Sequence, residues 1–272
     1  MARYILKLSC PDQPGIVAAV SGHFFERGAN IAESAQFEDP DTGRFFMRTV
    51  LESANPDIGK GFDAIAQKFG MDWSLRATDA HPRILILVSR AGHCLADLLY
   101  RKAVGDLPAD IVAIAGNHPR GQLEIRDLMD VPFHHIAAKD EAALEKLIAD
   151  TRADVIVLAR YMQILSDAFC NRYAGRIINI HHSFLPGFKG AKPYHQAHER
   201  GVKLIGATAH YVTGDLDEGP IIEQDVERIT HADTPEAMIA KGRDIERRVL
   251  TRAVTLHAED RVMLSGHKTI IL

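Results

Sequence analysis

The stretch RILILV at residues 83–88 decides the fold of the larger part of this 272-residue chain. Its apolar residues follow one another without alternation, which is typical of a strand that is buried on both faces of a sheet. Similar runs recur at residues 111–115, 155–158 and 177–180, and helix-like stretches separate them. This repetition of strand and helix predicts a mainly parallel, Rossmann-like α/β sheet.

The repetition breaks after the last of these strands. A loop rich in Gly and Pro at residues 186–193 precedes a short helix, and two strand-like runs follow at residues 204–212 and 220–226. We expect these two runs to pair as an antiparallel addition to the sheet. A long helix over residues 234–258 comes next, with a proline at its start, and the chain closes with an apolar run at residues 269–272.

Toward the N terminus, the short polar segment at residues 79–82 predicts a linker between two domains. The pattern before it indicates strands and helices in the order β-α-β-β-α-β, which predicts a ferredoxin-like domain. The expected elements are a strand at 3–9, a helix from 16 to a stop at Gly28, strands at 31–38 and 45–51, a helix at 58–69 and a strand at 71–78. We therefore expect one domain at residues 1–80 and a second at residues 84–272.

Charge is balanced along the chain. Lys and Arg number 32 against 36 Asp and Glu, a formal net charge of −4, and 46% of the residues are hydrophobic. These values are typical of an ordinary globular protein. A nucleic-acid-binding protein needs a concentrated basic surface, so we expect no nucleic-acid partner.

The cysteines point to a reducing compartment. Cys10, Cys94 and Cys170 lie far apart and form no CxxC pair, which argues against a disulfide framework and a thiolate zinc site. The first residues lack the long apolar core of a signal peptide, and no later stretch reaches the roughly 18 apolar residues of a membrane span. We expect a cytoplasmic protein with no membrane partner.

Candidate catalytic residues gather after the run at 177–180. The chain reads NIHHSFLP from residue 179, at the carboxyl end of a parallel strand, where open α/β sheets place their ligands. Side chains alternate along a strand, so Asn179 and His181 should share one side and His182 should point away. An amide and an imidazole side by side suit the stabilisation of a carbonyl oxygen as it gains charge. Residue types alone leave open that Asn179 merely ends a strand and His181 is an ordinary buried histidine.

A second group of polar residues occupies the loop TGDLDEGP at residues 213–220. Loops of this composition are often only solvated turns. Asp215 or Asp217 could equally reach a neighbouring imidazole or orient a water molecule for attack.

The sequence offers no support for a cofactor or a metal ion. The segment Ala91-Gly92-His93-Cys94 follows the first buried strand, but it lacks both the dinucleotide GxGxxG spacing and the P-loop GK[ST]. The paired histidines 134–135 and 181–182 are adjacent, so on a strand they face opposite ways and do not readily chelate one ion. We expect neither a cofactor nor a metal.

At this point two motifs carry a specific resemblance. The segment 179–226, with NIHHSFLP followed by AHYVTGDLDEGPII, resembles the folate-dependent formyltransferase fold, and CPDQPGIVAAVSGHFFERGANI at 10–31 resembles an ACT domain. An ACT domain ahead of a formyltransferase-type domain is similar to the formyltetrahydrofolate deformylase family. The resemblance covers essentially the whole chain, including GRFFMRT at 43–49 and the ending KTIIL.

The resemblance implies hydrolysis of 10-formyltetrahydrofolate to tetrahydrofolate and formate, which supplies one-carbon and purine metabolism. Asn179 and His181 match the family's NIH motif, and Asp217 matches the Asp of its D-x-G-P motif. In that case Asn179 and His181 stabilise the oxyanion, and Asp217 positions the water and supports a charged His181.

The resemblance also implies residues that bind substrate. The stretch at 158–165 resembles the family's pterin-binding segment, so the expected substrate-binding residues are Leu158, Tyr161, Met162, Gln163, Gly214 and Asp215. The related purine-pathway transferase usually has Arg where this chain has Gln163. That transferase also has a Gly-Ser-Asn phosphate cradle where this chain has the bulkier segment 91–94, which leaves water as the acceptor.

The ACT resemblance implies regulation by a small amino acid, with Asp12, Gly15 and Asn30 as the expected effector-binding residues. The alternative is that the ACT domain serves only assembly. ACT sheets commonly pair side by side, so we expect a homo-oligomer.

Two other functions stay open at this stage. The chain could transfer the formyl group to glycinamide ribonucleotide, or it could be a non-catalytic amino-acid sensor with a folate-binding remnant. The joint presence of Asn179, His181 and Asp217 argues against the sensor.

Overall fold

The computed structural model describes residues 1–185 and 193–272, and the Gly- and Pro-rich loop expected at 186–193 lies, apart from Pro193, outside the described residues. The chain forms two compact units. The first contains Met1–His81 together with Asp260–Ser265 and Ile270–Leu272, and the second contains Pro82–Glu259 and Gly266–Thr269.

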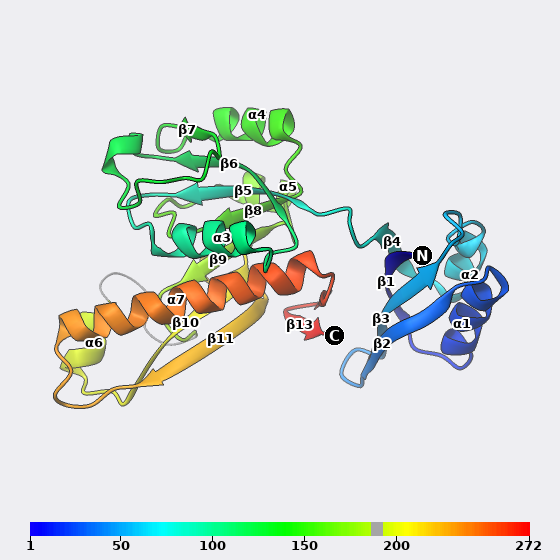
Figure 1. The fold of residues 1–272 in the computed structure, drawn as a ribbon. Helices are drawn as coiled ribbons and strands as arrows, with labels where there is room; N and C mark the ends of the chain where they lie inside the picture. Colours follow the sequence, from blue (N-terminus) through cyan, green and yellow to red (C-terminus); the bar gives the residue numbers. More distant parts are fainter. Residues whose placement is uncertain (186–192) are drawn as a thin grey trace. The chain divides into compact units, whose positions relative to one another are not determined.

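The first unit has the predicted β-α-β-β-α-β order (Figure 1). Its sheet is antiparallel in the order β2-β3-β1-β4, and both helices pack on one face. The elements are β1 (Ala2–Pro11), α1 (Ile16–Glu26), β2 (Asn30–Asp39), β3 (Arg44–Ser53), α2 (Phe62–Phe69) and β4 (Asp72–Ala77). Fully buried side chains from both helices and two strands fill the core between these layers, among them Leu6, Phe24, Met47 and Phe62.

Helix α2 begins later than expected. The periodicity predicts a helix from residue 58, but Gly61 has a φ of 82° and caps the helix, which starts at Phe62. A left-handed residue cannot lie inside a right-handed helix. Ile58 is instead fully buried in a turn, and its carbonyl contacts Nε2 of His23 at 3.2 Å.

The second unit has the mainly parallel sheet that the sequence predicts. Its strand order is β11-β10-β9-β8-β5-β6-β7. The strands β9, β8, β5, β6 and β7 run parallel, whereas β10 is antiparallel to both β9 and β11. The strands are β5 (Arg83–Val88), β6 (Asp110–Gly116), β7 (Phe133–His135), β8 (Val155–Leu158), β9 (Ile177–His181), β10 (Leu204–Tyr211) and β11 (Ile221–Arg228).

Helices cover both faces of this sheet. Leu144 and Phe169, from α4 and α5, pack in one core with alternate residues of the central strands, such as Leu85 and Leu87. Helices α3 and α7 pack against each other on the opposite face (Figure 1). The helices are α3 (His93–Val104), η1 (Arg120–Gln122), α4 (Glu141–Thr151), α5 (Asp167–Arg172), α6 (Pro193–Glu199) and α7 (Pro235–Ala258). None of the helices in the described ranges combines the length and the apolar character of a membrane span.

The C-terminal segment contributes to the first unit. After α7 the chain forms β12 (Val262–Ser265) and β13 (Lys268–Ile271), which pair with each other. Asp260 forms ion pairs with Lys7, at 3.1 Å, and with Arg76, and the Ser265 hydroxyl donates to Asp39 at 3.0 Å. The expected second domain included all residues after 84, whereas these contacts group Asp260–Ser265 with the first unit.

We expect opposite outcomes when alanine replaces two helical glycines. Alanine is normally favoured over glycine inside a helix by about 0.5–1 kcal/mol. A Cβ at Gly22 in α1 would meet nothing within 4 Å, so Gly22→Ala should stabilise the protein by about that amount. A Cβ at Gly242 in α7 would lie 2.4 Å from the ring of Tyr194, so Gly242→Ala should destabilise the protein by about 2 kcal/mol through overpacking. Urea unfolding of both variants measures these changes, and a stabilising Gly242→Ala would contradict the tight contact.

Candidate active site

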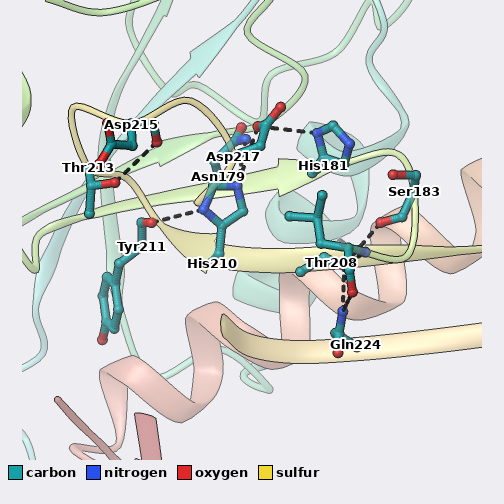
Figure 2. A network of polar contacts seen from close by, with 11 residues as sticks. Asn179, His181, Ser183, Thr208, His210, Tyr211, Thr213, Asp215, Asp217 and Gln224 are labelled. Atoms are coloured by element: carbon teal, nitrogen blue, oxygen red, sulfur yellow. Dashed lines mark hydrogen bonds and ion pairs between the residues drawn. The ribbon is translucent and has the colours of Figure 1, made fainter. Parts of the chain in front are cut away.

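Three polar side chains meet where β9 and β10 run side by side. Antiparallel pairing places His210 of β10 opposite Asn179 of β9. The Asn179 amide donates to Nε2 of His210 at 3.2 Å, and Nδ1 of His210 donates to the carbonyl of Tyr211 at 2.8 Å. This pattern corresponds to the neutral imidazole that is protonated on Nδ1. His181 is the last residue of β9 and lies on the same side as Asn179 (Figure 2).

Asp217 reaches this group from the loop between β10 and β11. Its Oδ1 lies 3.2 Å from Nδ1 of His181 and 3.7 Å from Nε2 of His210. Asp217 has a φ of 58°, a left-handed conformation that aspartate adopts more readily than most residues. The same loop ends on Gly219, where a Cβ would lie 1.7 Å from the Tyr211 carbonyl oxygen. The loop can therefore approach β10 this closely only with glycine at that position.

The two histidines determine the charge of Asp217. The hydrogen bond with His181, followed by the polar contact with His210, holds the pKa of the Asp217 carboxyl far below its usual range. Asp217 is thus a carboxylate at any physiological pH. Nε2 of His181, on the far side of the ring, is buried and has no hydrogen-bond partner among the described residues.

These residues line a pocket of about 270 Å³. The same pocket is lined by all the expected substrate-binding residues, Leu158, Tyr161, Met162, Gln163, Gly214 and Asp215. The structure therefore brings the expected catalytic and substrate-binding residues together around one cavity. The side chains of Met162, Ile164 and Leu216 are exposed at this pocket and give it an apolar rim.

Hydrogen bonds fix the pocket wall that follows β8. The Ser89 hydroxyl accepts from the Met162 backbone N–H at 2.9 Å and donates to the Asn117 side chain at 2.7 Å. The Ser89 backbone N–H donates to the Arg160 carbonyl at 3.2 Å. The loops after β5 and β8 are joined in this way, which holds the backbone around Met162 in place.

His210, Arg160 and His182 also line the pocket, although the sequence analysis did not select them. His210 lies in the strand-like run at 204–212, and its place opposite Asn179 depends on the register between the two strands, which only the structure gives. His182 was expected to point away from His181. It lies beyond the end of β9, where strand alternation no longer applies, and its ring centroid is 5.2 Å from that of His181.

The expected effector-binding residues do not form one cluster within the chain. Asp12 and Gly15 follow the end of β1, and Gly15 caps α1 with a φ of 95°. Asn30 begins β2, where it pairs with Glu52 of β3. Glu52 in turn pairs with Arg3, near the start of β1. Since β1 and β2 each span 10 residues and run in the same direction, Asn30 and Asp12 lie at opposite ends of the sheet, roughly 30 Å apart.

Comparisons with known proteins agree with this architecture. The formyl transferase family matches residues 82–254, and the ACT domain family matches residues 4–58. A formyltetrahydrofolate deformylase of Bacillus subtilis is 50% identical over 278 residues, which cover 98% of this chain and 92% of that protein. The crystal structure of a formyltetrahydrofolate deformylase from Pseudomonas putida has a TM-score of 0.93 at 44% identity and covers 99% of this chain and 100% of its own.

The similarity to the transferases is lower than the similarity to the deformylases, and it covers less of this chain. The glycinamide ribonucleotide transformylase 1 of Symbiobacterium toebii has a TM-score of 0.65 at 29% identity, and the match covers 71% of this chain and 94% of that one. The unmatched part of this chain is of the size of the N-terminal unit, whereas the deformylases match over the full length. The chain belongs to the formyltetrahydrofolate deformylase family, in which an ACT domain precedes a formyl transferase domain.

Proposed function

We propose that Asn179, His181 and Asp217 carry out the hydrolysis of 10-formyltetrahydrofolate to tetrahydrofolate and formate. The observation that carries this assignment is the contact of Asp217 with His181, at 3.2 Å, beside Asn179 in a single pocket. The second unit is then the catalytic domain, and the first unit is regulatory.

The reaction needs donors for an oxyanion and an acceptor for a proton. Water attacks the formyl carbon, and the carbonyl oxygen gains negative charge. The Asn179 amide has a second N–H besides the one that His210 accepts, and the unpartnered Nε2 of His181 is the second donor when that ring is charged. Asp217 orients the water and takes its proton. The C–N bond then breaks as the proton reaches the departing folate nitrogen.

The pocket suits one end of a folate. A volume of about 270 Å³ lies just below the usual range of about 300–1,000 Å³ for small-molecule sites, so the pocket holds the pterin and leaves the remainder of the molecule outside. Backbone groups around Met162 read the pterin amides. The exposed side chains of Met162, Ile164 and Leu216 cover the aromatic part that follows.

Each step of this mechanism moves only protons and one acyl group, and the proposal assigns these steps to protein side chains, without a cofactor or a metal ion. The three cysteines Cys10, Cys94 and Cys170 are all buried as free thiols, in accord with a reducing compartment. The proposed setting is the cytoplasm, where the formate enters one-carbon and purine metabolism.

We propose regulation through the N-terminal unit by a small amino acid. The ACT match and the Asp12 and Gly15 loop support an effector site at the start of α1. Because Asn30 lies at the opposite end of the same sheet, it contributes to such a site only from a second copy of the chain. The proposed regulatory form is therefore a homo-oligomer.

Asn179→Ala should lower kcat by about 10² to 10³-fold, because removal of one oxyanion donor costs about 3–4 kcal/mol of transition-state stabilisation. KM should change by no more than a few-fold, since the pterin contacts lie elsewhere in the pocket. Steady-state formate release measures both constants. The matched control is Asn171→Ala, an exposed asparagine of α5 outside the pocket. A near-normal kcat in Asn179→Ala would refute the assignment.

The acceptor separates hydrolysis from formyl transfer. We expect the purified protein to release formate from 10-formyltetrahydrofolate alone, at a rate that added glycinamide ribonucleotide does not change. Formate release and tetrahydrofolate formation are followed together. Turnover that requires the ribonucleotide would show a transferase, and the absence of turnover under both conditions would leave an amino-acid sensor.

Asp12→Ala should weaken binding of the effector at least tenfold, measured by titration calorimetry of the full-length protein with glycine and with methionine. The control is Asp57→Ala, an exposed aspartate of the same unit outside the α1 loop. Binding that is equally tight in Asp12→Ala would place the site elsewhere. If the wild-type protein binds neither amino acid at millimolar concentration, the N-terminal unit serves assembly alone.

A further inference from the structure

A second polar cluster lies beside the reaction pocket, and the hydrolytic mechanism does not use it. Glu246, in the middle of α7, is almost completely buried. Its Oε2 lies 2.8 Å from Nε2 of His93, its Oε1 accepts from the Tyr194 hydroxyl at 2.8 Å, and the Arg160 guanidinium lies 3.4 Å away. We call Glu246, His93, Tyr194 and Arg160 the Glu246 cluster.

The cluster occupies the position in the fold that normally receives a ligand. Strand β5 lies between β6, which follows it through α3, and β8, which comes later in the chain. The order of strands therefore reverses between β5 and β8, and open α/β sheets bind ligands in the crevice at the carboxyl ends of such strands. His93 is the first residue of α3 after β5, and Arg160 is the second residue after β8. The protein's own side chains fill this crevice.

The Glu246 cluster is continuous with the catalytic residues. Arg160 lines the same pocket as Asn179 and His181. The ring of His182 lies 5.2 Å from that of His181 and 6.3 Å from that of Tyr194. Burial and the nearby Arg160 lower the pKa of His182 to about 4, so it adds no charge between the two groups at neutral pH.

The carboxylate at the centre of the cluster is fully partnered. Among the described residues, His93, Cys94 and Glu246 form the one group close enough to share a metal ion. Both carboxylate oxygens of Glu246 already have partners, and the positive charge of Arg160 beside them opposes a cation. The Glu246 carboxylate is therefore partnered, as a buried charge requires, whereas the buried Nδ1 of His93 and Nε of Arg160 have no hydrogen-bond partner among the described residues.

We propose that the Glu246 cluster is an internal plug that keeps every nucleophile larger than water away from the formyl carbon, so that Arg160 and Glu246 determine the acceptor specificity of the reaction. An acceptor has to reach that carbon beside Asn179 and His181 while the folate occupies the pocket. The crevice between β5 and β8 adjoins that position, and the plug closes it. This inference rests on the proposed hydrolysis at Asn179 and His181.

Removal of the plug should admit an amine. The amine nitrogen then forms a bond to the formyl carbon, the C–N bond to the folate breaks, and an amine proton ends on the departing folate nitrogen. The products are a formamide and tetrahydrofolate, without oxidation or reduction. Water and the amine compete for one bound substrate, so the ratio of formamide to formate reports access to the formyl carbon.

The experiment uses the double variant Arg160→Gly/Glu246→Ala, which removes both charges of the Arg160–Glu246 ion pair together. Arg160 has a φ of 65°, which glycine tolerates well. Each protein is incubated with 10-formyltetrahydrofolate and excess glycinamide, and N-formylglycinamide and formate are quantified. We expect the ratio of the two products to rise at least tenfold over wild type. The ratio does not depend on the fraction of enzyme that is folded.

Two further measurements keep the result interpretable. Leu99→Ala opens a cavity under α3 almost two turns beyond His93, and it should leave the product ratio unchanged. Cys94, fully buried beside Glu246, should react with a thiol reagent at least tenfold faster in the double variant, while buried Cys10 and Cys170 keep their rates.

An unchanged product ratio in the double variant would overturn the proposal, as would a wild-type protein that formylates glycinamide equally well. If the double variant has no turnover, the product ratio cannot be measured and the labelling of Cys94 decides. Labelling of Cys94 at the wild-type rate would then overturn the proposal. The Asn179→Ala kinetics test the hydrolytic assignment separately, because they do not depend on the Glu246 cluster.

Discussion

The pocket of this protein depends on one carboxylate placed between two imidazoles. Asp217 joins a loop of the antiparallel addition to His181, at the end of a parallel strand, and to His210 on the neighbouring strand. The left-handed backbone at Asp217 and the close approach of Gly219 to Tyr211 each lower the free energy of unfolding locally. Contact with two histidines offsets these costs, and a mostly buried carboxylate without such partners would be far less favourable.

Most of the fold could be predicted from the sequence because apolar residues recur with one spacing in strands and another in helices. The continuous apolar run at 83–88 and its repeats correspond to β5, β6, β8 and β9, and the long helix at 234–258 is α7. The boundary of α2 was missed because apolar spacing continued through Ile58, while a left-handed glycine determined where the helix begins. Strand β7 has three residues, too few for any period to be visible.

The site was less visible in the sequence than the fold. Asn179 and His181 could be chosen because they are neighbours on one predicted strand, and the resemblance added Asp217. His210 depends on the register between two strands, which a single sequence does not determine. Glu246 and Arg160 lie 86 positions apart in the chain, and only the tertiary fold brings them together. A glutamate in a long, mostly polar helix looks like a solvated residue until its burial is known.

The first unit owes part of its structure to the last residues of the chain. Lys7 leaves the ribosome well before its partner Asp260, which is made 253 residues later, roughly 10–50 seconds at ordinary rates of synthesis. Until then the N-terminal sheet lacks the anion that neutralises Lys7 and Arg76. The unit that is translated first is thus among the last to be completed, and a nascent or prematurely terminated chain carries an unfinished ACT domain together with a formyl transferase sheet whose strands have all been made.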